Sequence, residues 1–242
     1  MSRARRSPAL RIWPRIEFSR LTNKSLAFAV DPSHRVSGIL LAPENARATY
    51  VLAHGAGAGM QQKFLEATAR GLAERGIATF RYNFPYMEAG GKRVDPPPLC
   101  HATVRAAVAE AARLVPGLPL IAGGKSFGGR MTSQAQALEP LGGVRGLAFL
   151  GFPLHPPGKP SVERAAHLAD VKVPMLFLQG SKDEFADLAL LEPMVAKLGK
   201  EVRLCLFDHA DHSFHVPAKS GRKDADVLSE VLDTLTAWIE DV

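Results

Sequence analysis

The sequence predicts a single α/β domain with a mainly parallel sheet and helices on both of its faces. From Ala48 onward, short apolar runs typical of buried strands alternate with longer segments of helical periodicity. This alternation is typical of right-handed βαβ units, which place parallel strands side by side. The chain has 242 residues, of which 46% are hydrophobic, so it can bury one sizeable core. We therefore expect one domain over residues 21–242, preceded by a basic arm over residues 1–20 that is a candidate for disorder.

The first two predicted strands, 25–30 and 35–41, flank the turn-forming sequence Asp31-Pro-Ser-His34. Such a short connection favours an antiparallel pair, which we expect at one edge of the sheet.

Further strands are predicted where short apolar runs lie between turn signals: 48–53, 77–81, 118–122, 146–150, 174–178 and 202–207. The helices expected between and after them cover 63–75, 103–114, 131–138 and 224–239, with a short helical stretch near 162–168 and one more helix before the last strand. Only about twenty residues separate the strands 146–150 and 174–178, which is too few for a helical cap domain over the sheet.

The strongest functional signal lies between the strand 118–122 and the helix 131–138. Here Gly124-Lys125-Ser126-Phe127-Gly128 forms a G-x-S-x-G pattern in the strand-turn-helix context that the pattern requires. A serine on such a sharp, strained turn is exposed at the edge of the sheet. The residues two before and two after it must be small, because strand and helix approach closely there. The alternative is a glycine-rich helix entry in which Ser126 only caps the helix.

Two nucleotide-binding patterns are excluded by spacing. A phosphate-binding P-loop ending at Lys125 would need glycine at position 119, where the chain has Pro119. The glycine run 55–59 follows a strand, but a dinucleotide fingerprint would need glycine at Met60.

A nucleophilic serine needs a base, and the base needs an acid that orients it. In folds with this turn, the chain order is serine, acid, histidine. Asp183 follows the strand 174–178 after a glycine turn, so it is the expected acid. The alternative role of Asp183 is the N-cap of the next helix.

Three histidines follow the last strand: His209, His212 and His215. We expect His212 to be the base, because His209 adjoins the strand and His215 runs into Pro217. A zinc site is an alternative for such a cluster, but no second group of ligands accompanies it, so no metal is expected.

Two further groups of residues are expected at this edge of the sheet. An oxyanion hole needs two backbone N–H groups. Phe127 after the nucleophile and Ala56, with Gly57 as the next choice, are the candidates; the glycine run can equally be a tight strand-to-helix turn. The loops 82–98 and 151–160 leave the carboxyl ends of strands. They are expected to wall the acyl pocket with the substrate-binding residues Tyr86, Phe152 and His155; the alternative is a solvated rim.

Five stretches of the sequence carry a family resemblance: 54–60, 81–88, 123–131, 151–160 and 210–215. In them the chain resembles the α/β hydrolases, and more narrowly the dienelactone-hydrolase-like branch. That branch also contains a testis-expressed protein and a subunit of the non-specific lethal chromatin complex. The resemblance implies Ser126, Asp183 and His212 as a catalytic triad. Dienelactone hydrolases proper use cysteine as the nucleophile, so their substrate cannot be transferred to this chain.

These observations predict a serine hydrolase that cleaves a small carboxylic ester, or a thioester or amide, through an acyl-enzyme on Ser126. Its partner would be a small-molecule acyl substrate, and no metal or organic cofactor is needed. The alternative is an interaction module that keeps the fold but has lost useful turnover, as in branch members that act as complex subunits.

The charge distribution and the cysteine content limit which classes of partner and which cellular compartment are expected. Of the net charge of +6, residues 1–20 carry +5, so the rest of the chain is almost neutral and nucleic acid is not expected as a partner. The 2 cysteines imply no disulfide framework, and no apolar run is long enough to span a membrane or to act as a secretory signal. A cytoplasmic location is therefore expected; the oligomeric state is left open.

Overall fold

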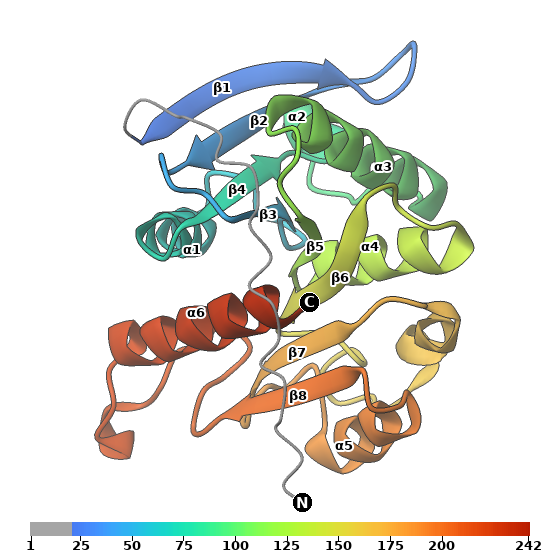
Figure 1. The fold of residues 1–242 in the computed structure, drawn as a ribbon. Helices are drawn as coiled ribbons and strands as arrows, with labels where there is room; N and C mark the ends of the chain where they lie inside the picture. Colours follow the sequence, from blue (N-terminus) through green and yellow to red (C-terminus); the bar gives the residue numbers. More distant parts are fainter. Residues whose placement is uncertain (1–20) are drawn as a thin grey trace, which may run out of the picture.

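The computed structural model describes residues 21–242, so the expected basic arm lies outside the described residues. These residues form an eight-stranded sheet with the strand order β1-β2-β4-β3-β5-β6-β7-β8 (Figure 1). The pairs β1–β2 and β2–β4 are antiparallel and all other neighbours are parallel. The predicted α/β class, with a mainly parallel sheet and an antiparallel pair at its edge, is confirmed.

The strands are β1 (Thr22–Ala29), β2 (Arg35–Ala42), β3 (Ala48–Ala53), β4 (Ile77–Tyr82), β5 (Leu120–Lys125), β6 (Val144–Leu150), β7 (Met175–Gly180) and β8 (Val202–Phe207). The α-helices are α1 (Lys63–Glu74), α2 (Pro85–Glu88), α3 (Pro97–Leu114), α4 (Phe127–Leu138), α5 (Leu188–Lys197) and α6 (Asp224–Asp241). Two 3-10 helices are η1 (Glu163–Asp170) and η2 (Ala218–Ser220). Since only η1 lies between β6 and β7, no cap domain covers this part of the sheet.

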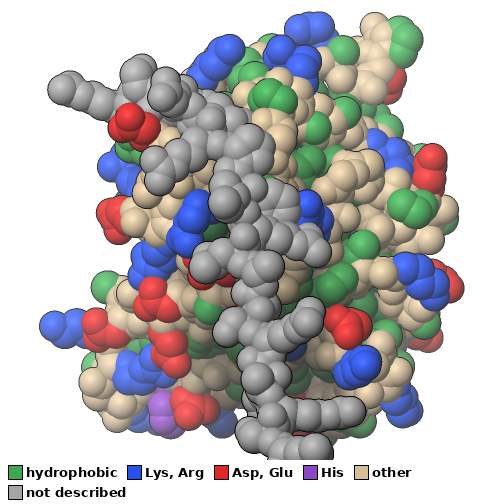
Figure 2. All heavy atoms as spheres, viewed as in Figure 1, with side chains coloured by type: hydrophobic (Ala, Val, Ile, Leu, Met, Phe, Trp, Pro, Cys, Tyr) green, Lys and Arg blue, Asp and Glu red, His purple; other side chains and the backbone are tan. Residues whose placement is uncertain are grey.

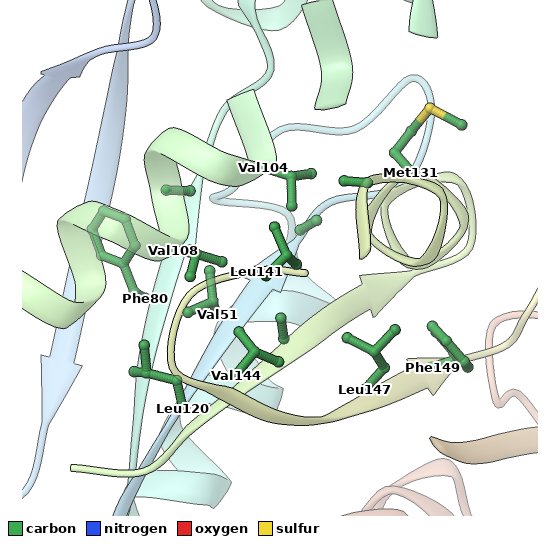
Figure 3. Packing of buried hydrophobic residues seen from close by; sticks show 14 of the residues in the cluster. Val51, Phe80, Val104, Val108, Leu120, Met131, Leu141, Val144, Leu147 and Phe149 are labelled. Carbon is green, nitrogen blue, oxygen red and sulfur yellow. The ribbon is translucent and has the colours of Figure 1, made fainter. Parts of the chain in front are cut away.

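The helices cover the sheet from two sides and create two apolar layers. Figure 1 shows α1 and α6 on the left of the sheet and α3, α4 and α5 on the right. Figure 3 shows the layer on the α3 and α4 side, where Val104, Val108 and Met131 meet strand residues such as Val51 and Phe149. Every residue of β3 is buried, which explains why its sequence is a continuous apolar run instead of an alternating one.

The helices that precede and follow the nucleophile strand in the sequence begin earlier than predicted. α3 begins at Pro97 instead of residue 103. Prolines are tolerated in the first turn of a helix, because backbone N–H groups there have no acceptor within the helix and proline lacks the N–H. α4 begins at Phe127 instead of residue 131. The strand β5 continues through two glycines, which pair with β3 on one side and β6 on the other. Strand and helix are therefore separated by Ser126 alone.

The crossing of β3, β5 and α4 leaves no room for side chains at the motif glycines. A Cβ atom added to Gly124 would lie 2.4 Å from the Ala53 carbonyl oxygen. One added to Gly128 would lie 2.5 Å from the His54 carbonyl oxygen and 2.7 Å from Cβ of Ala53. The atoms in the way are backbone carbonyl oxygens of Ala53 and His54 and the Cβ atom of Ala53. They cannot move away without displacing β3.

We therefore predict that Gly128→Ala lowers the free energy of unfolding by about 1–3 kcal/mol, the range expected for overpacking a tight interior. Gly142→Ala is the matched control, because an added Cβ there has nothing within 4 Å. The control should change stability by no more than about 0.5 kcal/mol. Urea unfolding of both variants measures the difference, and equal stabilities would contradict the steric argument.

Candidate active site

Ser126 occupies a strained backbone position between β5 and α4. Its φ of 51° and ψ of −118° lie in a region that non-glycine residues rarely adopt, at a cost of about 1–3 kcal/mol. The Ser126 N–H donates to the Leu150 carbonyl oxygen at 3.2 Å, and the Arg130 N–H donates to the Ser126 carbonyl oxygen at 3.1 Å. The serine side chain makes no capping hydrogen bond to the helix, so the alternative that Ser126 only caps α4 is wrong.

The imidazole of His212 bridges the serine and an aspartate. Its Nε2 lies 2.8 Å from Ser126 Oγ, and its Nδ1 lies 2.7 Å from Asp183 Oδ2. Ser126 follows β5, Asp183 follows β7 and His212 follows β8. These strands are parallel, so the three side chains lie together at the carboxyl ends of the strands. The structure thus brings together the three residues that the sequence predicts as acid, base and nucleophile.

The carboxylate of Asp183 is fully buried and is held by several donors. Besides His212, the Phe185 N–H donates to Oδ1 at 2.8 Å and the Gln179 side-chain amide donates to Oδ2 at 2.5 Å. Helix α5 is capped instead by Asp187, whose carboxylate accepts from the Ala189 N–H at 2.9 Å. The alternative role of Asp183 as the N-cap of the next helix is therefore wrong.

Gln179 positions the acid, although no sequence motif pointed to it. Its side chain is completely buried near the end of β7, where its Oε1 accepts from the Phe152 N–H at 2.8 Å. Because one end of the amide is fixed in this way, its NH₂ group is directed at Asp183. The signal in the sequence was a single polar residue at the end of the apolar run 174–178.

Lys125, directly before the nucleophile, is a second residue at the site to which the sequence pattern gave no role. Its ammonium group donates to the His212 carbonyl oxygen and lies 5.7 Å from the centre of the Phe214 ring. Burial lowers the pKa of Lys125 to about 8, while the nearby charges of Asp183 and Asp211 favour the charged form. The lysine therefore ties the loop that carries the base to the end of the nucleophile strand.

The other two histidines of the cluster point elsewhere. His209 is exposed, with a φ of 64°, and its N–H donates to Ser181 Oγ at 2.9 Å. His215 is also exposed and pairs with Asp224 at 2.9 Å, and this hydrogen bond raises the pKa of His215. Only His212 reaches both the serine and the buried acid.

The loop after β3 is held in place by His54. Its Nε2 accepts from the Phe84 N–H at 3.0 Å, so its Nδ1 carries the proton and donates to the Gly55 carbonyl oxygen at 2.8 Å. Burial lowers the pKa of His54 to about 4, which keeps the imidazole neutral at pH 7. Because both ring nitrogens of His54 are hydrogen-bonded to backbone groups, the histidine fixes the path of the glycine run beside Ser126.

Of the expected oxyanion donors, Phe127 directly follows the nucleophile and Ala56 lines its pocket, whereas Gly57 does neither. Phe127 is the first residue of α4, where backbone N–H groups have no acceptor within the helix. Ala56 lines the same pocket as Ser126. Gly57 is absent from that lining, and its backbone lies beside the hydroxyl of Tyr86 instead.

A pocket of about 270 Å³ opens at Ser126 and His212. Its other walls come from the loop after β3 and the start of α1, from Lys125, and from the loops after β7 and β8. The remaining lining residues are Gly55, Ala56, Ala58, Gln62, Phe64, Leu65, Lys125, Phe185 and Ser213. The ring of Phe185 also packs against the imidazole of His212, with ring centres 4.4 Å apart.

The expected acyl-pocket residues Tyr86, Phe152 and His155 are absent from this lining, so that part of the prediction is wrong. Phe152 is fully buried between Phe149 and Phe177, with ring centres 5.3 and 5.5 Å away. An aromatic residue directly after a strand can fill the core as readily as a pocket, and the sequence does not distinguish the two.

His155 and Tyr86 serve the backbone and the core. His155 is 3% exposed, and its Nε2 accepts from the Asp187 N–H at 2.8 Å while its Nδ1 lies 2.9 Å from the Pro156 carbonyl oxygen. Tyr86 is 5% exposed and packs edge-on against His54. The apolar wall of the pocket comes instead from α1 and from the loop after β7.

On the face seen in Figure 2, acidic and basic side chains are interspersed. Within residues 21–242, none of the helices combines the length and the apolar character that crossing a membrane requires.

A family model described as an α/β hydrolase domain matches residues 46–240. The chain belongs to the α/β hydrolase family. In fold, this α/β hydrolase is similar to a dienelactone hydrolase from Anabaena variabilis, with a TM-score of 0.71 and 21% identity over 90% of this chain and 97% of that one. The predicted likeness to dienelactone hydrolases is thus confirmed at the level of the fold.

Two further solved structures share the fold of this α/β hydrolase. A serine hydrolase without a lid from Xanthomonas campestris has a TM-score of 0.69 and 21% identity, covering 92% of this chain and 97% of that one. The esterase domain of a Rhodothermus marinus protein has a TM-score of 0.69 and 16% identity, covering 91% of this chain and 98% of that one.

The buried, neutral His54 gives a prediction for acid stability. Its pKa is about 4 in the folded chain and near 6.5 when exposed, so the unfolded chain binds more protons between these values. Stability contributed by the neutral form is complete above pH 6.5 and is lost as the pH falls towards 4. In His54→Gln, which keeps an acceptor for the Phe84 N–H, the loss should be smaller by about 1.4 kcal/mol per pH unit.

Urea unfolding of the wild type and of His54→Gln between pH 6.5 and 4.5 measures this difference. The control is His209→Gln, which replaces an exposed histidine and should leave the pH dependence of the wild type in place. An unchanged pH dependence in His54→Gln would contradict the assignment of a neutral, buried imidazole.

Proposed function

We propose that this α/β hydrolase is a serine hydrolase that cleaves small carboxylic esters through an acyl-enzyme on Ser126. The observation that carries the proposal is the position of His212, with one ring nitrogen 2.8 Å from Ser126 Oγ and the other 2.7 Å from Asp183 Oδ2. A hydroxyl, an imidazole and a buried carboxylate in this order activate a serine for attack on a carbonyl carbon. The fold shared with an esterase domain and a lidless serine hydrolase supports the same class of reaction.

In the proposed reaction, His212 Nε2 takes the proton of Ser126 as Oγ attacks the carbonyl carbon. Asp183 keeps the proton of the imidazole on Nδ1 and stabilises the imidazolium that forms. The tetrahedral oxyanion accepts hydrogen bonds from the Phe127 and Ala56 N–H groups, each worth about 3–4 kcal/mol of transition-state stabilisation. His212 then protonates the leaving alcohol, and water attacks the acyl-enzyme with His212 again as the base.

The surroundings of the triad suit a small acyl group. The pocket of about 270 Å³ has apolar walls at Phe64, Leu65 and Phe185. A thioester or an amide carries the same carbonyl group as an ester and needs no different catalytic residue. The rival function, an interaction module without turnover, would need no hydrogen-bonded serine, histidine and aspartate.

A fluorophosphonate probe separates the two functions, because it reacts only with an activated serine. The wild type should be labelled, and Ser126→Ala should not be labelled. Ser213→Ala is the matched control, since Ser213 lines the same pocket and should leave labelling intact. Intact-mass spectrometry measures the adduct, and a folded wild type that stays unlabelled would contradict the proposal.

The base is tested by comparing the three histidines of one loop. His212→Ala should lower the rate of ester hydrolysis by several powers of ten, and adding Ser126→Ala should lower it little further, because triad members act as a unit. His209→Ala and His215→Ala should stay within about tenfold of the wild type. Rates are compared among variants with matched unfolding midpoints. An inactive His209→Ala beside an active His212→Ala would overturn the assignment of the base.

Chain-length preference tests the size of the acyl pocket. Each buried CH₂ group contributes about 0.8 kcal/mol, but a chain that extends beyond the pocket finds no cap domain to cover it. Acetyl to butyryl p-nitrophenyl esters should therefore have a higher kcat/KM than esters of twelve or more carbons. A preference for the long esters in monomeric, detergent-free solution would show that an extended apolar groove binds the chain.

A further inference from the structure

A cluster of basic side chains lies between α3, α4 and η1, outside the pocket that contains Ser126. Arg130 belongs to α4, His101 to α3, and Arg164 and His167 to η1. All four side chains are partly buried, and none of them lines the pocket at the serine. The cluster is therefore separate from the proposed catalytic residues, although Arg130 lies on the helix that begins directly after the nucleophile.

The two guanidinium groups of the cluster have no acidic partner among residues 21–242. The Nε of Arg130 is buried without a hydrogen-bond acceptor, and its guanidinium stacks over the Phe127 ring with its carbon 5.8 Å from the ring centre. The side chain of Arg164, whose charge acts on Arg130, forms neither an ion pair nor a hydrogen bond within the described part of the chain. By contrast, the neighbouring Arg105 is held by Glu139 and by two backbone carbonyl groups. A guanidinium group that is partly withdrawn from water normally has an acceptor or an acidic partner, so two neighbouring arginines without one point to a ligand that supplies it.

The two histidines are fixed by hydrogen bonds that leave one ring nitrogen unused. His167 Nε2 lies 2.8 Å from Ser133 Oγ, and this hydroxyl donates its own proton to the Arg130 carbonyl oxygen at 2.9 Å. The proton of the neutral imidazole is therefore on Nε2. His101 Nε2 lies 3.2 Å from the side-chain oxygen of Gln134, which places its proton on Nε2 as well. In both rings Nδ1 has no partner among the described residues.

The electrostatics of the cluster agree with its composition. Burial lowers the pKa of Arg130, and the neighbouring charge of Arg164 lowers it further. Burial lowers the pKa of His167 to about 4, with further lowering by Arg130 and His101; Asp170 acts weakly in the opposite direction. The pKa of His101 is also lowered, by burial first and then by Arg105 and Arg130. Positive charge therefore predominates among these groups, and a bound anion would favour their charged forms and so oppose the lowering of each pKa.

We propose that Arg130, Arg164, His101 and His167 form a binding site for a phosphate group, either as the free ion or as part of a phosphorylated small molecule. Two guanidinium groups match the double negative charge and the several acceptor oxygens of a phosphate. The unused Nδ1 atoms of the two histidines can become donors to the same group when they take up a proton. The site is independent of ester hydrolysis, and its failure would leave the proposed function untouched.

The experiment is a titration of the full-length chain with inorganic phosphate at constant ionic strength, followed by the imidazole signals of His101 and His167 in NMR spectra. Phosphate should shift both signals and raise both pKa values, which binding elsewhere on the surface would not do. Arg130→Met and Arg164→Met should each weaken binding at least tenfold. Arg113→Met is the matched control, because Arg113 on α3 is paired with Glu110, and its affinity should equal that of the wild type.

Three outcomes would overturn the proposal. The histidine signals could stay unchanged up to 50 mM phosphate, an order-of-magnitude ceiling for weak anion contacts. Arg113→Met could weaken binding as much as Arg130→Met, which would indicate general charge attraction. Acetate could bind as tightly as phosphate, which would assign the site to a single carboxylate. Since Arg164 is on the outer 3-10 helix, its variant keeps the test valid even if Arg130→Met fails to fold.

Discussion

The tight crossing of β3, β5 and α4 is the constraint on which the rest of the site depends. Gly124 and Gly128 let the strand and the helix approach the backbone of Ala53 and His54 to distances that exclude any side chain. With α4 beginning directly after it, Ser126 has to make the whole turn, and it does so at a φ of 51°. The strained conformation persists because β5 is hydrogen-bonded to a neighbouring strand on each side, and this pairing offsets the cost.

A chain of buried polar contacts connects the two loops that must meet this serine. Gln179 at the end of β7 fixes Asp183, Asp183 fixes His212, and the His212 carbonyl oxygen is held by Lys125 at the end of β5. The contacts therefore link the ends of three strands. Gln179 and Asp183 are buried and His212 and Lys125 are partly buried, so several hydrogen bonds together set the geometry of the imidazole.

Two partly buried cations, Lys125 and Arg130, differ in the partners that surround them. Lys125 is close to Asp183 and Asp211, and its ammonium group has a backbone acceptor. Arg130, in the first turn of α4, has no acidic partner and no acceptor for its Nε within the described residues, and the charge of Arg164 lies nearby. The first arrangement is complete without a ligand, whereas the second is completed by an anion. This contrast is the physical basis for assigning them to different roles.

The sequence by itself determined the strand and helix order, the antiparallel edge and the chain order of Ser126, Asp183 and His212, because local periodicity and turn residues decide these features. Only the tertiary structure decided which side chains around them face the pocket. Phe152 and His155 follow a strand just as Phe185 follows another, yet Phe152 fills the core, His155 binds backbone groups and Phe185 lines the pocket. Their direction depends on packing between loops far apart in the chain, and no local pattern records it.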